Sequence, residues 1–395
     1  MKNKIIDFLD LGAQPLANNF INKKKLLNKE RKYRLIICFN KINKLVSIKK
    51  IISSNDMFND KYPYRSSTSQ TMTVHLKKLA NIIKKSKPKK ILEIGSNDGC
   101  FIRNFERNKT IGIEPCANVE KITKKDNYNT YPEYWTPKLA RKILKKHNKV
   151  DLIFSSNTIS HIEDLDDVFK GINIALDDKG VFIIEDPSLL ECLKKNTYDQ
   201  FYNEHIYVFS YLGLSNSLKK HNLEIFKIEK LEIHGGSNRY YIKKNSNALK
   251  LHKSVHNHMY EEKKFGINNL KTYTNFAKRV RLSKKKLLHI FKNCKKNNKK
   301  VVGYGATAKS VTILNYCNIN NKMIDYFVDT TPDKQNKYTP GTKILIKKYV
   351  NLIDDNVDFV FLGAWNFQQE IFNKEKKYIK SGGKFIIHTP YPKII

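Results

Sequence analysis

Two carboxylates stand beside two glycines in residues 93–99, which read Glu-Ile-Gly-Ser-Asn-Asp-Gly. Nucleotide-binding turns are usually Gly-x-Gly-x-x-Gly, because small residues let a pyrophosphate approach the backbone at a helix N-terminus. Here Glu93 and Asp98 would repel a pyrophosphate, so a cationic ligand fits the turn better. The residue types therefore predict a site for a positively charged small molecule.

The elements around this turn are those of an open α/β sheet. Residues 91–94 are typical of a buried parallel strand, residues 95–99 of a tight turn, and we expect a helix from Phe101 onward. About twenty residues later a second apolar strand, 111–113, ends in Glu114. An acid at that point is placed to accept both hydroxyls of a ribose.

Two further strands follow: residues 150–154 run into Ser156 and Asn157, and residues 180–184 run into two acids. Four strands that end in polar residues at helix-sized intervals form a composite signal. The pattern resembles the class I methyltransferases, with the turn in the place of their motif I. This resemblance implies S-adenosyl-L-methionine as the cofactor, with its sulfonium and ammonium charges. The residues expected to bind it are Glu93, Gly95, Asn97, Asp98, Gly99, Glu114 and Asn157.

A second α/β unit begins near Lys299, where a strand runs into Gly303-Tyr304-Gly305-Ala306. An ordinary strand-to-helix turn remains the alternative to a ligand site there. We therefore expect an α/β protein with a doubly wound, Rossmann-like methyltransferase sheet, a small N-terminal lobe and a C-terminal Rossmann-like domain. The expected boundaries are 1–70, 71–285 with a long connector helix from about 248 to 292, and 286–395.

Over nearly its whole length the chain resembles the three-domain sugar C-methyltransferases, typified by the nucleotide-diphosphate-hexose 3-C-methyltransferases of deoxysugar pathways. Five motifs in order carry the resemblance: Leu-Gly-Ala-Gln-Pro-Leu-Ala at 11–17, Tyr-Pro-Tyr-Arg-Ser-Ser at 62–67, Tyr-Asn-Glu-His at 202–205, His-Gly-Gly-Ser-Asn-Arg at 234–239 and Gly-Tyr-Gly-Ala-Thr-Ala-Lys at 303–309. The resemblance implies C-methylation of a nucleotide-diphosphate keto-deoxysugar.

The N-terminal lobe departs from that family. Its members generally hold a structural zinc with two cysteine pairs, whereas this lobe contains only Cys38. Four thiolate-type ligands cannot be assembled, so we expect a degenerate zinc-binding lobe without metal.

Methylating a carbon beside a ketone needs a base for the α-proton and a donor for the enolate oxygen. His205 is the natural base because imidazole titrates near neutrality, and the family places Glu204 and Tyr202 with it. The family also places Tyr64 and His161 in the sugar pocket. Their alternatives are a core-filling tyrosine and a helix-capping histidine, and for His205 alone a buried, satisfied histidine.

The substrate's diphosphate would meet a second group of residues. His234 and Arg239 flank a Gly-Gly turn at Gly235 that can approach phosphates closely, and Lys309 lies where a helix N-terminus would present amides. Trp365 either packs against the nucleotide or is structural.

Composition narrows the function classes. The 395-residue chain has a formal net charge of +37, nearly all from Lys, which we interpret as a solvated surface rather than a nucleic-acid site. A nucleic-acid methyltransferase would carry an Asn/Asp-Pro-Pro-Tyr motif where residues 185–188 read Glu-Asp-Pro-Ser. No apolar run reaches the ~20 residues of a membrane span, and the cysteines are scattered, so a cytoplasmic enzyme is expected. An O- or N-methyltransferase and a non-catalytic binding protein stay open, as do the nucleotide, the methylated carbon and the oligomeric state.

Overall fold

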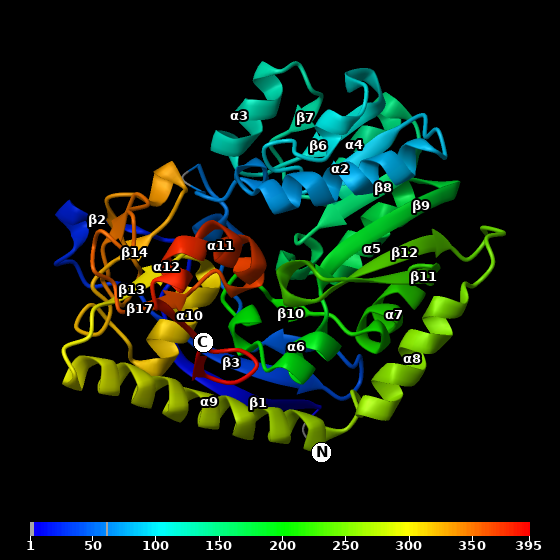
Figure 1. The fold of residues 1–395 in the computed structure, drawn as a ribbon. Helices are drawn as coiled ribbons and strands as arrows, with labels where there is room; N and C mark the ends of the chain where they lie inside the picture. The colour runs from blue at the N-terminus through cyan, green and yellow to red at the C-terminus, as the bar shows by residue number, and fades with distance from the viewer. Residues whose placement is uncertain (1–3, 61) are drawn as a thin grey trace.

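The middle part of the chain forms a seven-stranded sheet, toward the upper right in Figure 1. The computed structural model describes residues 4–60 and 62–395. The sheet order is β11-β12-β9-β8-β5-β6-β7. Its strands are β5 (Ile91–Ile94), β6 (Thr110–Ile113), β7 (Thr130–Tyr131), β8 (Val150–Ser156), β9 (Leu176–Pro187), β11 (Leu223–Leu231) and β12 (Ser237–Lys244). Strands β5 to β9 run parallel, and β12 is antiparallel to both β9 and β11.

Helices cover both faces of this sheet, as the buried strands require. One face packs on α2 (Gln70–Lys84), whose buried Leu76 and Leu79 meet Phe101 and Phe154. The other face packs on α4 (Pro137–His147), α5 (Leu165–Ala175) and α7 (Tyr211–Lys219), and α3 (Ala117–Lys125) lies near the β7 edge. The predicted doubly wound α/β sheet is therefore confirmed.

The C-terminal part is a second, mostly parallel sheet in the order β16-β14-β13-β17-β18-β19. Its elements are β13 (Val301–Tyr304), α10 (Ala308–Cys317), β14 (Phe327–Val328), β16 (Ile346–Lys347), β17 (Phe359–Leu362), α11 (Gln368–Lys374), α12 (Lys376–Lys380), β18 (Lys384–Ile387) and β19 (Lys393–Ile394). Only β19, at one edge, is antiparallel to its neighbour. The predicted second Rossmann-like unit is present.

Strands of the N-terminal lobe pair with strands of both other parts. Its sheet has the order β1-β3-β4-β10, built from β1 (Ile5–Gln14), β3 (Tyr33–Asn40), β4 (Val46–Ile48) and β10 (Tyr207–Val208). The last strand follows the Tyr-Asn-Glu-His block of the middle part. The short β2 (Ile21–Asn22) pairs with β15 (Lys337–Tyr338) of the C-terminal part.

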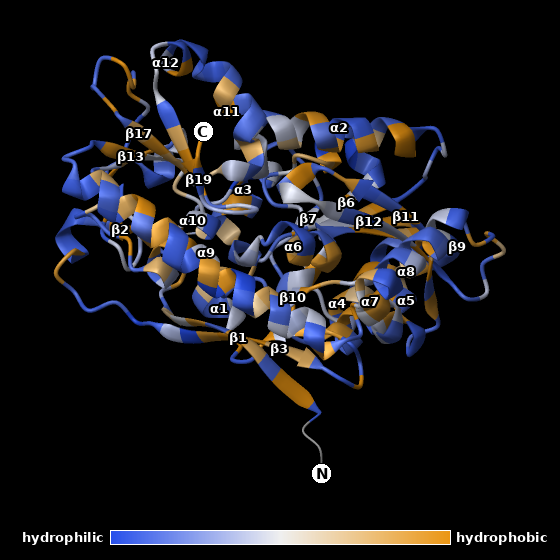
Figure 2. Cartoon of the chain, turned by 60° about the horizontal axis from the view of Figure 1, so that its bottom comes forward, coloured by the Kyte–Doolittle hydropathy of each residue, from blue (hydrophilic) through white to orange (hydrophobic). Residues whose placement is uncertain are grey.

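A long helix holds these parts together. α9 (Leu270–Lys296) runs beneath β1 and β3 and reaches the C-terminal unit (Figure 1). Its Tyr273 stacks on Phe39, with ring centroids 4.7 Å apart, and contacts Phe8 at 4.9 Å. The largest apolar cluster joins these rings to residues of all three parts, including Ile206 and Phe361. In Figure 2 the outward faces of the helices are mainly hydrophilic.

Two local predictions differ from the structure. The helix expected from Phe101 is only a 3₁₀ turn, Ile102–Asn104. The Asn104 amide donates to the carbonyls of Cys100 and Phe101, at 3.0 and 2.9 Å, and so competes with helix continuation. The single connector helix is two helices, because Gly266, at φ +85°, caps α8 (Lys253–Phe265) in the left-handed region before α9 begins.

No helix in the described ranges 4–60 and 62–395 is long and apolar enough to cross a membrane.

We predict that the purified protein holds no stoichiometric zinc. Within the described residues no group of three metal-ligating side chains was found, and the lone Cys38 is a buried thiol whose pKa burial raises. Elemental analysis should give far less than one zinc per chain, and a chelator should leave the unfolding temperature unchanged. About one tightly held zinc per chain would contradict this.

Candidate active site

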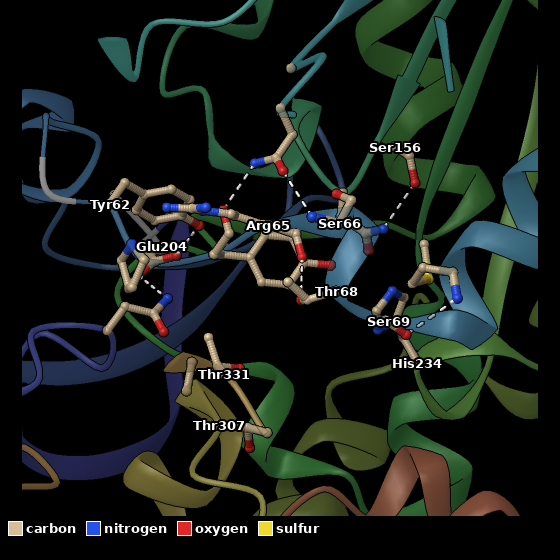
Figure 3. Close-up of a pocket in the computed structure, with 18 of the residues that line it drawn as sticks. Tyr62, Arg65, Ser66, Thr68, Ser69, Ser156, Glu204, His234, Thr307 and Thr331 are labelled. Atoms are coloured by element: carbon tan, nitrogen blue, oxygen red, sulfur yellow. Dashed lines mark hydrogen bonds between the residues drawn. The ribbon is translucent and has the colours of Figure 1, made fainter. Parts of the chain in front are cut away.

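A large cavity, of about 640 Å³, lies where the middle and C-terminal sheets face each other. All three parts of the chain line it, among them Asn18, Glu93, His205 and Lys309. Figure 3 shows Tyr62 and Glu204 together on one side, with Thr307 and Thr331 of the C-terminal part below them. Both sheets therefore present the ends of their strands to one space, as open α/β sheets do at their ligand sites.

The glycine turn after β5 forms one end of the cavity. Gly95 has φ +75°, and a Cβ there would come within 2.1 Å of the Thr158 hydroxyl oxygen, so only glycine fits. Glu93, the third residue of β5, is buried, and its Oε2 has no hydrogen-bond partner among the described residues. Burial raises the pKa of Glu93 well above its usual range. An unsatisfied carboxylate at this point suits a cationic ligand, which would satisfy it.

Glu114 ties the turn to the second strand. Its Oε2 accepts the Asn97 backbone N–H at 2.9 Å, and its Oε1 accepts the Cys116 N–H at 2.8 Å. Burial raises its pKa, and these two N–H groups oppose that rise. Each oxygen keeps a lone pair for a ribose hydroxyl, so Glu114 fits the predicted role.

The other predicted cofactor residues divide into two groups. Asn97 and Asn157 line the cavity, and both have positive φ, at 47° and 51°. Asp98 and Gly99 are not among the lining residues: Asp98 accepts hydrogen bonds from the backbone and hydroxyl of Ser67, and Gly99 turns the chain. These two residues therefore shape the turn, and Asp98 holds the 62–69 segment against it.

His205 and Tyr202 are directly hydrogen-bonded. His205 Nδ1 lies 2.7 Å from the Gln200 carbonyl, which can only accept, so Nδ1 carries the proton. The lone pair of Nε2 therefore accepts the Tyr202 hydroxyl at 2.6 Å. Burial lowers the pKa of His205 well below its usual value, which keeps the ring neutral. Burial also raises the pKa of Tyr202 well above its usual value, so the phenol keeps its proton at rest and the hydrogen bond supplies a path along which that proton can move to the imidazole.

His161 and Glu204 flank this pair. His161 stacks between Phe58 and His205, with centroids 5.5 and 5.0 Å away. Its Nε2 is buried and has no hydrogen-bond partner in the described part of the chain, and burial lowers its pKa to about 4. Glu204 accepts from Asn18 Nδ2 at 2.7 Å and from the Tyr62 hydroxyl at 3.1 Å, and burial raises its pKa to about 7. Tyr64, the last of the predicted catalytic group, also lines the cavity.

Two of the four residues predicted to bind the diphosphate line the cavity, and two do not. Lys309 and His234 line the cavity, but Gly235 and Arg239 are not among the lining residues. Arg239 is buried in an ion-pair cluster, where it donates to Glu185 and, at 2.7 Å, to Glu229. Those carboxylates already use its guanidinium, so the structure does not bring Arg239 to the site.

Gly235 lies under an indole. A Cβ on it would come within 2.1 Å of the ring of Trp365. Trp365 Nε1 donates to the buried Asp199 at 2.5 Å. Of the two roles that the sequence left open for Trp365, the contacts support the structural one, at the junction of the middle and C-terminal parts.

Lys309 is the cation of the C-terminal side. The residue is 8% exposed, and its ammonium lies 5.5 Å from the Trp365 ring centroid. No carboxylate of the described chain lies within ion-pair distance of it, and burial lowers its pKa to about 8. The charge of Asp199 acts on the ammonium from beyond ion-pair distance, and the buried ammonium on the cavity wall is still suited to an anionic ligand.

Comparisons with known proteins agree with this geometry. Residues 65–228 match the family model of a methyltransferase domain, and residues 232–390 match that of a C-methyltransferase C-terminal domain. The C-methyltransferase NovU of Streptomyces niveus is 27% identical over 396 residues, which cover 99% of this chain and 94% of that protein. The chain therefore carries a methyltransferase domain followed by a C-methyltransferase C-terminal domain. It is an S-adenosylmethionine-dependent methyltransferase.

Solved structures that resemble this chain cover less than half of it. Magnesium protoporphyrin IX methyltransferase of Synechocystis is 8% identical, with a TM-score of 0.32, over 44% of this chain and 79% of that one. A methyltransferase of Anabaena variabilis is 16% identical, with a TM-score of 0.31, over 39% and 76%. The fold of this chain is therefore described from its own strand order and not from these distant matches.

Three contacts of this C-methyltransferase site were missed from the sequence. Gln200 fixes the tautomer of His205, and Asn18 and Tyr62 hold Glu204. Asn18 directly follows the 11–17 motif, and Tyr62 is the first residue of the 62–67 motif. Their place next to or within family motifs could have pointed to a role in the site.

We predict that Glu114→Ala weakens S-adenosylmethionine binding by about 1–3 kcal/mol, because paired ribose hydroxyls lose their acceptor. Isothermal calorimetry measures this directly. Glu106→Ala, which removes an exposed carboxylate of the same unit, is the matched control and should bind normally. Unchanged affinity in Glu114→Ala would remove Glu114 from the site.

Proposed function

We propose that this enzyme methylates a carbon next to the ketone of a nucleotide-diphosphate keto-deoxysugar. The cavity supports the proposal most strongly, because it joins the Glu93–Glu114 end, the Tyr202–His205 pair and the Lys309 ammonium. Methyl donor, acidic carbon and diphosphate would thus lie in one enclosed space. We expect the reaction in the cytoplasm, in keeping with six unpaired cysteines.

The base would act through the tyrosine. Tyr202 donates a hydrogen bond to His205 Nε2, so its oxygen can take the substrate's α-proton as its own phenolic proton moves to the imidazole. The C–H electrons then form an enolate. His161 is neutral near pH 7 because its pKa is lowered, and its unpartnered Nε2 can donate to the enolate oxygen when it carries the ring proton.

S-adenosylmethionine would supply an electrophilic methyl group, whose bond to sulfur breaks as the enolate carbon bonds to it, with the electron pair remaining on sulfur. The chain's contribution is alignment. Glu93 and Glu114 would hold the cationic and ribose parts of the donor, and the substrate's anionic end would be held by Lys309 across the cavity.

The deciding experiment supplies methyl-labelled S-adenosylmethionine and a panel of nucleotide-linked keto sugars and locates the label by NMR. The proposal requires the label on a ring carbon beside the ketone. Label on oxygen or nitrogen, or no transfer to any nucleotide sugar, would refute it.

We predict that His205→Asn and Tyr202→Phe each lower turnover by ~10²–10⁴ while the affinities for cofactor and nucleotide sugar stay nearly intact, because the two groups form one proton path. Turnover and calorimetric binding are measured on the same samples. His289→Asn, which changes an exposed histidine of α9, is the matched control.

Exchange of the substrate's α-hydrogen gives a second readout. In deuterated buffer with S-adenosylhomocysteine bound, the wild type should exchange this hydrogen and both variants should not. A His205→Asn enzyme that exchanges and methylates at the wild-type rate would end its role as the base.

We also predict that affinity for the nucleoside diphosphate falls as pH rises through about 8. The pKa of Lys309, lowered to about 8 by burial, makes its ammonium lose its charge in that range. Lys309→Met should bind more weakly at neutral pH and show little of this pH dependence. Lys286→Met, on an exposed position, should behave as the wild type. An unaltered pH profile in Lys309→Met would contradict the assignment.

A further inference from the structure

The position of His161 depends on the short turn that carries it. Its imidazole packs between Phe58 and His205, and its Nε2 has no hydrogen-bond partner among the described residues. The backbone here is a single 3₁₀ turn, η5 (Ile159–His161), after β8. A 3₁₀ turn of three residues makes few hydrogen bonds of its own. Contacts from outside the turn therefore decide where the ring lies.

One buried side-chain hydrogen bond holds this turn. Ser160, the residue before His161, is 1% exposed, and its hydroxyl donates to Asp186 Oδ1 at 2.6 Å. Asp186 lies near the end of β9, the parallel neighbour of β8. Neither Ser160 nor Asp186 is among the residues that line the cavity. The bond therefore ties the turn to the seven-stranded sheet from behind the site.

The Asp186 carboxyl is buried at a cost in folding free energy. It is 1% exposed, and its Oδ2 has no hydrogen-bond partner in the described part of the chain. Burial raises the pKa of Asp186 to about 7, against hydrogen bonds from Ser160 that lower it. An apolar side chain would avoid this cost but could not accept a hydrogen bond from Ser160. Packing alone therefore does not account for an acid at this position.

The neighbouring strand indicates which oxygen holds the proton when Asp186 is neutral. Asp186 lies directly opposite Asn238 in the antiparallel β9–β12 ladder, so the two side chains project on the same face of the sheet. The Asn238 Oδ1 is also buried without a partner among the described residues. A proton on Asp186 Oδ2 would supply the donor that both oxygens lack, while Oδ1 still accepts from Ser160. An amide in place of this carboxyl could make the same two bonds.

We propose that Ser160 and Asp186 are positioning residues: their hydrogen bond fixes the 159–161 turn and so holds His161 Nε2 toward the enolate oxygen. This rests on the proposed function, in which His161 donates to that oxygen, and it adds two residues outside the cavity lining. Displacing a catalytic group by about 1 Å lowers rates by up to ~100-fold. Loss of the bond should therefore slow enolate formation and leave ligand binding nearly unchanged.

The test measures enolate formation and binding separately. Ser160→Ala should lower both turnover and exchange of the substrate's α-hydrogen in deuterated buffer by about 10- to 100-fold. The KM for the nucleotide-linked keto sugar that accepts the label, and the calorimetric affinity for S-adenosylhomocysteine, should stay within about threefold of the wild type. Ser217→Ala is the matched control, because Ser217 is also a buried serine, whose hydroxyl donates to the Gly213 carbonyl within α7. It should behave as the wild type.

Two substitutions of Asp186 separate its hydrogen bond from its acidity. Asp186→Asn keeps an acceptor oxygen for Ser160 and should retain turnover within about threefold of the wild type. Asp186→Val removes the acceptor and should be as slow as Ser160→Ala. Asp178→Asn, at an exposed position near the other end of β9, is the control for a lost carboxylate.

A double substitution shows whether the pair acts through His161. His161→Phe keeps an aromatic ring between Phe58 and His205 but removes the Nε2 donor. In that background Ser160→Ala should lower the remaining transfer of labelled methyl by less than about twofold, because the group that it positions is already gone. A purely structural effect would lower the transfer by the same factor in both backgrounds.

The outcomes separate this inference from the proposed function. Wild-type exchange and turnover in Ser160→Ala, a matching loss of S-adenosylhomocysteine affinity, equal losses in the two backgrounds, or an Asp186→Asn enzyme as slow as Asp186→Val would each overturn the positioning role and leave the C-methylation proposal standing. If the wild type binds S-adenosylhomocysteine but methylates no nucleotide-linked keto sugar, the proposed function fails and this inference fails with it.

Discussion

The position of the reacting side chains depends on a buried charge outside the cavity. Asp199 is fully buried, and its Oδ2 accepts the Trp365 indole N–H at 2.5 Å and lies 3.4 Å from His388, both from the C-terminal part. The next residue, Gln200, fixes His205 through its carbonyl and donates to the His234 carbonyl at 2.6 Å. A buried carboxylate without partners is strongly destabilising, so the folded chain favours the arrangement that supplies them. That arrangement also sets the tautomer of the base.

The same segment is held from its other end by the N-terminal lobe. Asn203 donates to the Pro15 carbonyl at 3.0 Å, Glu204 is held by Asn18 and Tyr62, and β10 pairs with β4. Residues 199–208 thus contact all three parts of the chain. Rigid support from several elements keeps a base within hydrogen-bonding distance of its partner, which proton transfer requires.

Local patterns in the sequence predicted much of this, and long-range contacts account for what they missed. Residues 91–94, the glycine turn and Glu114 could be predicted because a parallel strand, a tight turn and a strand-end acid are encoded by neighbouring residues. The helix expected at Phe101 was wrong because one side chain, Asn104, bonds to the carbonyls of its own turn. Asn18 is 186 residues from Glu204, and no local pattern reports such a pair. Arg239 suits a phosphate by type, and only the fold reveals the carboxylates that surround it.

Strand sharing makes the chain less modular than three successive segments suggest. β10 completes the N-terminal sheet from within the middle part, and β2 pairs with β15 of the C-terminal part. If two relatives recombined at the segment boundaries, the strands on either side of each shared ladder would come from different parents. Backbone pairing as well as side-chain packing would then be mismatched. Residues on both sides of each shared ladder must therefore evolve together, which links changes in the lobe that lacks zinc ligands to changes beside the base.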